Sequence, residues 1–274
     1  MNTFTLLIFP LAGLALFNST DKNLIVQKPT GALQSHADNS WHPDTTESKR
    51  PDLAKGKAVV IWQPSHQTNT GKDFSEAAVC NGIVEAAMRA RPNLKEYKVW
   101  SLGKKDLHHA DVGSNTVIEH TSAVIDEKIS GYAWELQSAN KRDPHVFISV
   151  HNNGGTNRHA IWGYIHEGDA YEAENRKLAE RLVKAISDVT DLQNRGVLLD
   201  SSTGRNDYRC SSTNKPAFYS LDEQMNQAPY RVLLEIGDNA LSKTFLEDPA
   251  NQKKMGEALK KELTLWLTEK QNGQ

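Results

Sequence analysis

The first sign of the fold is a short apolar run, Ala58-Val59-Val60-Ile61-Trp62. A continuous run of this kind is typical of a strand that is covered on both faces. Comparable runs predict further strands at 97–102, 145–150, 161–165 and 230–234. Helical patterns predict helices over about 73–91, 115–140 and 172–189, and a last amphipathic helix that carries Met255, Leu259, Leu263, Trp266 and Leu267. Strands that alternate with helices predict an α/β fold, with a mostly parallel central sheet and helices on both of its faces.

The N-terminal segment differs from the rest of the chain. From Phe4 to Phe17 it is apolar, with no charged side chain before Asp21 and no Lys or Arg ahead of the run. The length suits the core of a signal peptide, and Gly13-Leu14-Ala15 fits a cleavage site between small residues. We therefore expect residues 1–18 to be a signal peptide, residues 19–55 to be a polar linker without fixed structure, and the protein to be exported to the periplasm or the cell exterior.

The composition excludes several classes of protein. The 274 residues carry a formal net charge of -2, which argues against a nucleic-acid-binding protein, since such proteins normally present a basic face. Beyond the N-terminal segment no stretch is long and apolar enough to span a membrane. With two cysteines there is no disulfide framework. Cys80 and Cys210 could form one bridge in an oxidising compartment, but a buried free thiol is the default for Cys80.

Side chains that can bind a metal or move a proton follow three of the predicted strands. The first strand leads to His66, the strand at 145–150 to His151, and the strand at 230–234 to Glu235. Open α/β sheets build their sites just past the carboxyl ends of their strands. We therefore expect these three side chains to converge on one functional site.

Glu76 supplies a fourth candidate for this site. It shares a helix face with Val79, Cys80, Ile83 and Ala87, and is the only charged residue on that face. A carboxylate on an apolar face needs a partner, because burying an unpaired charge is costly. Two interpretations stay open here: Glu76 is a metal ligand, or it completes a capping box whose N-cap is Asp73.

The predicted site suits a zinc ion. Two histidines and one carboxylate, here His66, His151 and Glu76, are a recurring ligand set for catalytic zinc, with one position left for water. Glu235 would take the proton of that water and pass it to the leaving amine, although a buried ion pair with an arginine is the alternative for this residue. Most of the other histidines are expected to be ordinary surface residues. His166 stands apart, because like the predicted ligands it follows an apolar run.

Taken in order, these motifs resemble the zinc-dependent N-acetylmuramoyl-L-alanine amidases of the type 3 amidase family. The similarity runs from about Lys57 to Thr268. It rests on the strand before His66, the glutamate at the start of the next helix, and three further motifs: Ser149-Val150-His151-Asn152-Asn153, Leu178-Ala179 with Arg195-Gly196, and Leu233-Leu234-Glu235-Ile236-Gly237. Two motifs depart from the family pattern. Gln63-Pro64-Ser65-His66-Gln67-Thr68 stands where Asp-Pro-Gly-His-Gly-Gly is usual, and Asp238 stands where Phe is usual.

The resemblance implies an activity, a cofactor and a substrate. Residues 56–270 would be a zinc amidase catalytic domain that hydrolyses the amide bond between N-acetylmuramic acid and L-alanine in cell-wall peptidoglycan. His66, Glu76 and His151 would bind Zn²⁺, and Glu235 would be catalytic. Two other functions remain: zinc-dependent hydrolysis of another peptide-like amide, such as a γ-glutamyl bond, or peptidoglycan binding without catalysis.

Overall fold

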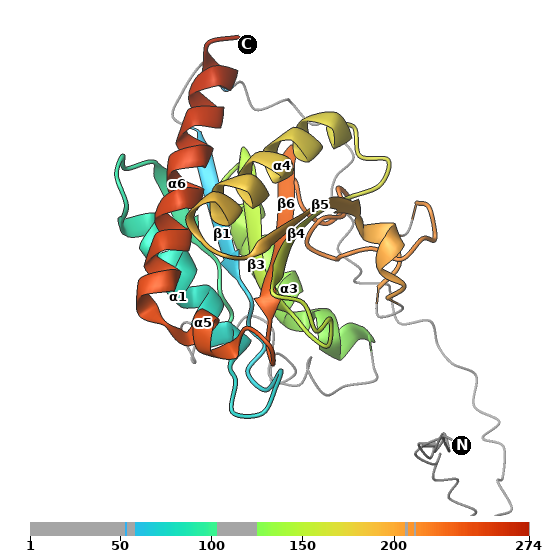
Figure 1. Cartoon of the computed structure of the whole chain (residues 1–274). Coiled ribbons are helices and arrows are strands. Elements are labelled where there is room, and N and C mark those ends of the chain that lie inside the picture. Colours follow the sequence, from blue (N-terminus) through green and yellow to red (C-terminus); the bar gives the residue numbers. More distant parts are fainter. Residues whose placement is uncertain (1–52, 54–57, 103–124, 206–207, 211, 274) are drawn as a thin grey trace, which may run out of the picture. The chain divides into compact units, whose positions relative to one another are not determined.

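The computed structural model describes Leu53 and residues 58–102, 125–205, 208–210 and 212–273 (Figure 1). These residues belong to one compact unit of the chain, Pro43–Gln274. The predicted signal peptide, the predicted linker except Leu53, and the first part of the predicted helix at 115–140 lie outside the described residues.

The described part of the chain forms one sheet of six strands in the order β2-β1-β3-β6-β4-β5. The strands are β1 (Val59–Pro64), β2 (Lys95–Lys98), β3 (Val146–Asn153), β4 (Ala160–Ile165), β5 (Gln193–Leu199) and β6 (Tyr230–Asp238). Neighbouring strands are parallel except for β4 and β6, which are antiparallel. The predicted α/β fold with a mostly parallel sheet is confirmed.

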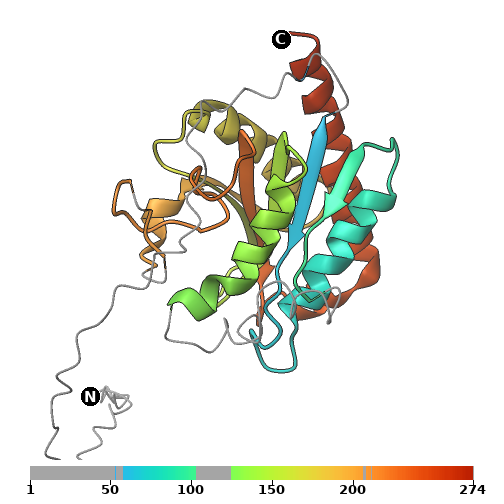
Figure 2. The ribbon, with the colours of Figure 1, turned by 180° about the vertical axis from the view of Figure 1, so that it is seen from behind.

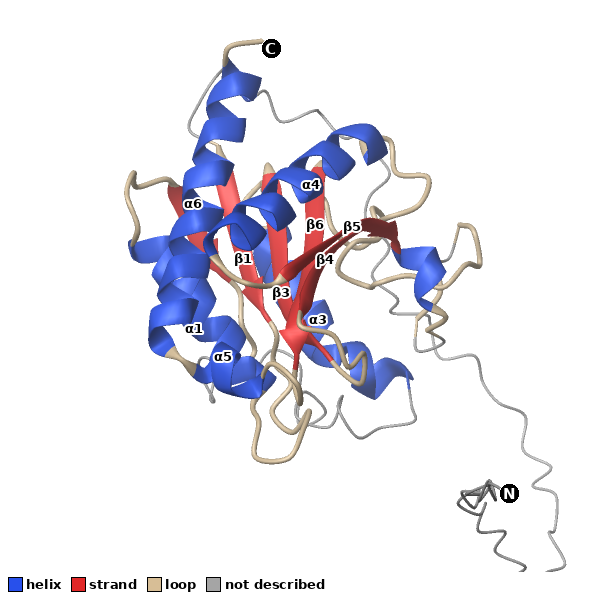
Figure 3. Cartoon of the chain, viewed as in Figure 1, coloured by secondary structure: helices blue, strands red, loops and turns tan. Residues whose placement is uncertain are grey.

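Helices cover both faces of this sheet (Figures 1 and 3). They are α1 (Glu76–Arg89), α3 (Ile125–Asn140), α4 (Glu172–Val189), α5 (Lys243–Glu247) and α6 (Pro249–Gln271), with a short 3-10 helix, η3, at Asp200–Thr203. On one face α1, α4 and α6 share a core with Val60 and Trp62 of β1. On the other face α3 lies over the sheet (Figure 2). Its Leu136 packs with Val59 and Ile61 of the same strand. Because successive strand residues face opposite sides, two covered faces require the continuous apolar run seen in the sequence.

Most predicted elements lie where the pattern places them, and α4 has the predicted bounds. The second strand was placed wrongly: β2 ends at Lys98, whereas the apolar run suggested 97–102. Beyond Lys98 the chain still follows β1, since the N–H of Val99 donates to the carbonyl of Trp62. Helices α5 and η3 were not predicted, and the apolar pattern did not predict β5, although the family resemblance implied a short strand after Arg195-Gly196. The first half of β5 is exposed and polar, so it carries no apolar pattern.

The sheet order brings the predicted site residues to one edge. Strands β1, β3 and β6 are adjacent and parallel, so their carboxyl ends lie together. His151 is the register partner of Glu235, and Trp162 of antiparallel β4 pairs with Glu235 from the other side. The proton-carrying candidate is thus placed by backbone pairing on both sides. Among the described helices, none has the length and apolar character needed to cross a membrane.

Candidate active site

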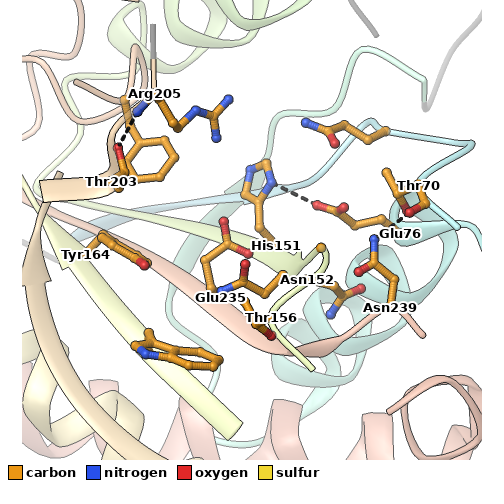
Figure 4. A pocket seen from close by; sticks show the side chains of 15 residues that line it. Thr70, Glu76, His151, Asn152, Thr156, Tyr164, Thr203, Arg205, Glu235 and Asn239 are labelled. Atoms are coloured by element: carbon orange, nitrogen blue, oxygen red, sulfur yellow. Dashed lines mark hydrogen bonds and ion pairs between the residues drawn. The ribbon is translucent and has the colours of Figure 1, made fainter. Parts of the chain in front are cut away.

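Glu76, His151 and Glu235 line one cavity of about 600 Å³ at the carboxyl edge of the sheet (Figure 4). In Figure 4 the carboxylate of Glu76 points to the ring of His151, and Glu235 lies beside that ring. All three residues are buried. Of the four side chains expected to converge, these three line the cavity and His66 does not.

The side chain of Glu76 is available to the cavity, because another residue caps the helix on which it lies. Ser75 is the N-cap of α1, and its side-chain oxygen accepts from the N–H of Ala78. Asp73 has a φ of 53° and lies outside the helix, so the capping box with Asp73 is not formed. As the first helical residue, Glu76 is 2 % exposed, and its Oε1 lies 2.9 Å from Nδ1 of His151. The carboxylate on the apolar face thus has an imidazole as its partner.

His151 presents both ring nitrogens to polar surroundings. Its Nδ1 contacts Glu76, at a distance that suits a hydrogen bond and also two neighbouring ligands of one ion, each about 2 Å from the metal. Its Nε2 is buried and has no hydrogen-bond partner among the described residues. The ring of Tyr132 stacks over the imidazole with 6.3 Å between ring centroids and 28° between planes. A buried imidazole nitrogen without a protein partner is the kind of group that a bound metal or water satisfies.

His66 is close to this group but does not line the cavity. It is fully buried, and its ring centroid is 4.2 Å from that of Tyr132, the residue that also stacks on His151. Its Nδ1 lies 2.9 Å from Oε1 of Glu135. An ionised carboxylate only accepts hydrogen bonds, so Nδ1 carries the proton and Nε2 carries the lone pair. The structure therefore brings Glu76 and His151 into contact, with His66 buried against the same tyrosine ring.

Glu135 is a buried site residue that sequence reasoning missed. Its Oε1 also accepts from the N–H of Ser101 at 2.8 Å, and its Oε2 accepts from Nε2 of Gln63 at 2.5 Å. Gln63 in turn accepts from the hydroxyl of Ser149 at 2.7 Å. An aspartate at 63, as in the usual family motif, would set two carboxylates against each other, whereas the glutamine amide donates to Glu135. The sequence signal that could have identified Glu135 is its position on the buried face of α3, together with Leu136 and Ala139.

Glu235 has the environment of a proton carrier. Burial, followed by the negative charge of Glu76, raises the pKa of Glu235 to about 8, and the charge of Arg205 opposes this rise. Its Oε2 is buried without a hydrogen-bond partner among the described residues. A carboxyl with a pKa near neutrality can both accept and release a proton under ordinary conditions. The alternative, a buried ion pair with an arginine, is not found for Glu235 among the described residues, and its backbone is paired with strands on both sides.

Cys80 is near these carboxylates but has the character of a structural residue. Its Sγ donates to Oδ1 of Asn152 at 3.4 Å, and Asn152 donates to the carbonyl of Ile236. Burial, with the charges of Glu76 and Glu235, raises the pKa of the Cys80 thiol well above its ordinary value. Cys80 and Cys210 are both free, as the default for Cys80 predicted. A protonated buried thiol is a poor metal ligand, because the thiolate is the binding form.

Asp238, the second departure from the family motif, organises the rim of the cavity. Its Oδ2 accepts from the N–H and hydroxyl of Thr156 and from the N–H of Asn157. Its Oδ1 accepts from the N–H groups of Ala240 and Leu241. Burial opposes ionisation, but these hydrogen bonds hold the pKa of Asp238 below its ordinary value. The aspartate thus ties the loop after β3 to the loop after β6.

The opposite wall of the cavity is aromatic and carries one positive charge. Tyr164 of β4 packs against Phe218 with 5.3 Å between ring centroids, and the guanidinium of Arg205 lies 4.9 Å from the Phe218 centroid. Figure 4 shows Arg205 and Thr203 on this wall. A cationic side chain here can contact an anionic group on a bound molecule.

Comparisons with known proteins give a consistent assignment. The model of one protein family, described as N-acetylmuramoyl-L-alanine amidase, matches residues 107–264, which is more than half of the chain. The match contains His151 and Glu235 and begins after His66 and Glu76. No curated protein matches this chain.

Solved structures of amidases share the fold. The CwlD amidase from Clostridioides difficile, in complex with the GerS lipoprotein, has a TM-score of 0.53 at 15% identity, covering 78% of this chain and 99% of that one. An N-acetylmuramoyl-L-alanine amidase from Clostridium difficile 630 gives 0.51 at 14% identity, with 78% and 98% covered. The catalytic domain of CwlV from Bacillus (Paenibacillus) polymyxa gives 0.50 at 16% identity, with 77% and 98% covered.

Proposed function

The chain belongs to the N-acetylmuramoyl-L-alanine amidase family, hydrolases that act on cell-wall peptidoglycan, and on this premise we propose that His66, Glu76 and His151 hold a zinc ion while Glu235 moves the proton. The observation that carries the proposal is one arrangement in one cavity: Glu76 in contact with His151, and Glu235 beside His151 on the next strand. The family is generally zinc-dependent.

The residues present fit zinc in their donor chemistry. Two imidazoles and a carboxylate are the ligand set of many catalytic zinc sites. Nδ1 of His151 lies 2.9 Å from Oε1 of Glu76, a separation that two ligands of one ion can have. When bound, zinc would lower the pKa of a water molecule and polarise the carbonyl of the amide under attack.

Glu235 would move the proton at its Oε2. Its pKa of about 8 makes the ionised form a stronger base than an ordinary carboxylate. After accepting the proton of the attacking water, the buried carboxylic acid is well suited to donate it to the leaving amine. The register with His151 and Trp162 fixes the backbone of Glu235 at the edge of the cavity.

Glu135 and Arg205 would support the reaction without taking part in proton transfer. Glu135 fixes the tautomer and the ring orientation of His66 through Nδ1, an arrangement that raises the basicity of the other ring nitrogen. Arg205 on the opposite wall would pair with a carboxylate of the peptide part of peptidoglycan. The substrate would thus be held by the wall that faces the catalytic groups.

The substrate also implies a location. Family members act on cell-wall peptidoglycan, which lies outside the cytoplasm. The apolar segment from Phe4 to Phe17, read as an export signal, would bring the protein there. Sequencing the N-terminus of the mature protein from fractionated cells tests this. Recovery of the chain from the cytoplasm with Met1 retained would contradict export.

Product analysis tests the bond that is cut. Digestion of purified peptidoglycan should release intact stem peptides that begin with L-alanine and leave the glycan strands uncut. Mass spectrometry of the soluble fraction distinguishes the alternatives. Shortened stem peptides would indicate another amide, such as a γ-glutamyl bond, and binding without released products would indicate a non-catalytic protein.

A further inference from the structure

Three potential metal ligands meet outside the candidate active site. His166 follows β4, Cys210 lies in the segment after η3, and Asp222 precedes β6. One imidazole nitrogen, the thiol sulfur and one carboxylate oxygen lie within 4.8 Å of one another, and all three residues are buried. None of them lines the cavity described above.

His166 is oriented toward this cluster by a carboxylate. Its Nδ1 donates to Oδ2 of Asp200 at 2.7 Å, which leaves Nε2 as the nitrogen for another partner. Asp200 is fully buried and is itself fixed by the N–H groups of Glu167 and Phe218. Metal-binding histidines almost always donate their second nitrogen to a carboxylate, carbonyl or water in this way. The imidazole is thus prepared as a ligand.

Cys210 differs from Cys80 in the groups that surround its sulfur. Burial opposes ionisation of Cys210, but hydrogen bonds from Ser212 and Thr213 lower its pKa below the ordinary value. The Oγ of Ser212 lies 3.0 Å from the sulfur. The turn is closed by Asn214, whose N–H donates to the carbonyl of Cys210. This closed turn holds the sulfur of Cys210 within 4.8 Å of the ligand atoms of His166 and Asp222.

Asp222 is held as firmly as His166. Its Oδ2 accepts from the hydroxyl of Tyr208 at 2.7 Å, and its Oδ1 accepts from the N–H of Gln224 at 2.8 Å. The carboxylate is fully buried. Two acceptor oxygens have further lone pairs, so these bonds leave capacity for a cation.

We propose that His166, Cys210 and Asp222 form a second zinc site, with Asp200 as the residue that orients His166. A nitrogen, a thiolate and a carboxylate are donors that zinc accepts, and three protein ligands leave one tetrahedral position for water. The site goes beyond the proposed amidase function, since no step of hydrolysis needs it. Its role is to fix a wall of the cavity: Asp200 accepts from the N–H of Phe218, and Phe218 lines the cavity together with Arg205.

The competing arrangement is an ionic network without metal. Burial opposes the charge of His166, but Asp200, Asp222 and Cys210 raise its pKa to about 9, so the metal-free ring is an imidazolium. Such a ring between two aspartates satisfies the charges by itself. Metal binding therefore has to be measured directly, and the sulfur ligand provides a specific signal.

Cobalt substitution of the full chain tests the proposal. Co²⁺ bound to a thiolate gives a charge-transfer absorption in the near ultraviolet, and the predicted catalytic ligands contain no sulfur. The cobalt protein should show this band. Cys210→Ser should lose both the band and one equivalent of metal, while Cys80→Ser, the matched control at the other cysteine, should keep both.

Further variants separate this site from the catalytic one. His151→Ala should keep the thiolate band even if it loses catalytic zinc, so failure of the amidase proposal would not remove the signal. Asp222→Asn retains the thiol and should lower the affinity for zinc in a competition assay with a chelator. The proposal is overturned if the wild-type cobalt protein shows no thiolate band, or if wild type and Cys210→Ser bind equal amounts of zinc with circular dichroism unchanged.

Discussion

His151 and Glu235 are register partners on neighbouring parallel strands, whereas His166, Cys210 and Asp222 come from three connecting segments. The first pair is positioned by backbone hydrogen bonds of the sheet. The second cluster is positioned by side-chain bonds such as those of Asp200 to His166 and of Tyr208 to Asp222. A sheet fixes its side chains independently of what they bind, so the first site can be prepared before a ligand arrives. The connecting segments, in contrast, depend on these side-chain bonds for their positions.

The two clusters also differ in how their carboxylates are satisfied. Oε2 of Glu235 has no hydrogen-bond partner among the described residues, and burial raises its pKa to about 8. Both oxygens of Asp222 accept hydrogen bonds. An under-satisfied buried acid is costly to folding and is found where chemistry requires it. A well-satisfied buried acid stabilises its surroundings. The comparison therefore assigns reaction chemistry to the first cluster and a structural role to the second.

The largest expected effect is on turnover and comes from Glu235→Gln. The amide keeps the shape of the side chain but cannot accept the proton of water, so turnover should fall by about a hundredfold to ten-thousandfold. Bound zinc should stay near the wild-type level, because Glu235 is proposed as a proton carrier. Metal analysis beside an activity assay decides this, with the exposed Glu223→Gln as matched control.

Glu76→Ala completes the same experiment. Glu76 is a proposed ligand in contact with His151, so its removal should lower both bound zinc and activity. If Glu76→Ala keeps its zinc, Glu76 only orients His151. If Glu235→Gln loses its zinc, the roles of these two carboxylates have been exchanged.

An intermediate effect is expected from Glu135→Gln. The variant weakens the bond to Nδ1 of His66 and places two amides, at 63 and 135, next to each other. Loss of a residue that orients a metal-bound histidine typically costs about tenfold to a hundredfold in metal affinity. Competition with a chelator measures zinc affinity directly, and Glu96→Gln is a control because Glu96 is also part-buried in hydrogen bonds but lies outside the cavity. Unchanged zinc affinity would show that Glu135 does not support the metal site through His66.

The fold was readable from the sequence wherever burial imposed a pattern. Helix α4 has one buried face, and strands β1 and β3 are covered on both sides, so the pattern of their apolar residues predicted these elements. Strand β5 was missed because its first residues are exposed and polar. Strand β2 was displaced because Val99 is buried without belonging to the ladder. An apolar pattern in the sequence indicates which residues are buried. It misplaces a strand where a buried residue is not paired in the sheet, or where a paired residue is exposed.

The site was readable in part for a similar reason. His151 and Glu235 follow apolar strands, so their convergence could be expected from strand order alone. To predict Glu135 as a site residue, one would have to know which face of α3 meets the sheet. To predict Cys210, one would have to know the path of connecting segments that carry no periodicity. His166 was singled out by the apolar run before it, but its partners at 200, 210 and 222 depend on tertiary contacts. Functional residues that follow apolar strands can be predicted from a sequence, whereas those in connecting segments without periodicity cannot.

The smallest expected effect tests how the two clusters are coupled. Asp200→Asn keeps the size of the side chain but weakens the bond to His166 and the hold on the N–H of Phe218. Because Phe218 lines the cavity beside Arg205, the proposed contact for the substrate, the change should act on substrate binding. We expect KM to rise by less than about tenfold, which corresponds to about 1.4 kcal/mol, with kcat and catalytic zinc nearly unchanged. The exposed Asp188→Asn on α4 is the matched control. Steady-state kinetics on soluble peptidoglycan fragments separate the two constants. A fall in kcat comparable to that of Glu235→Gln would mean that the second cluster belongs to the catalytic centre, and that the division drawn between the sheet and its connecting segments is wrong.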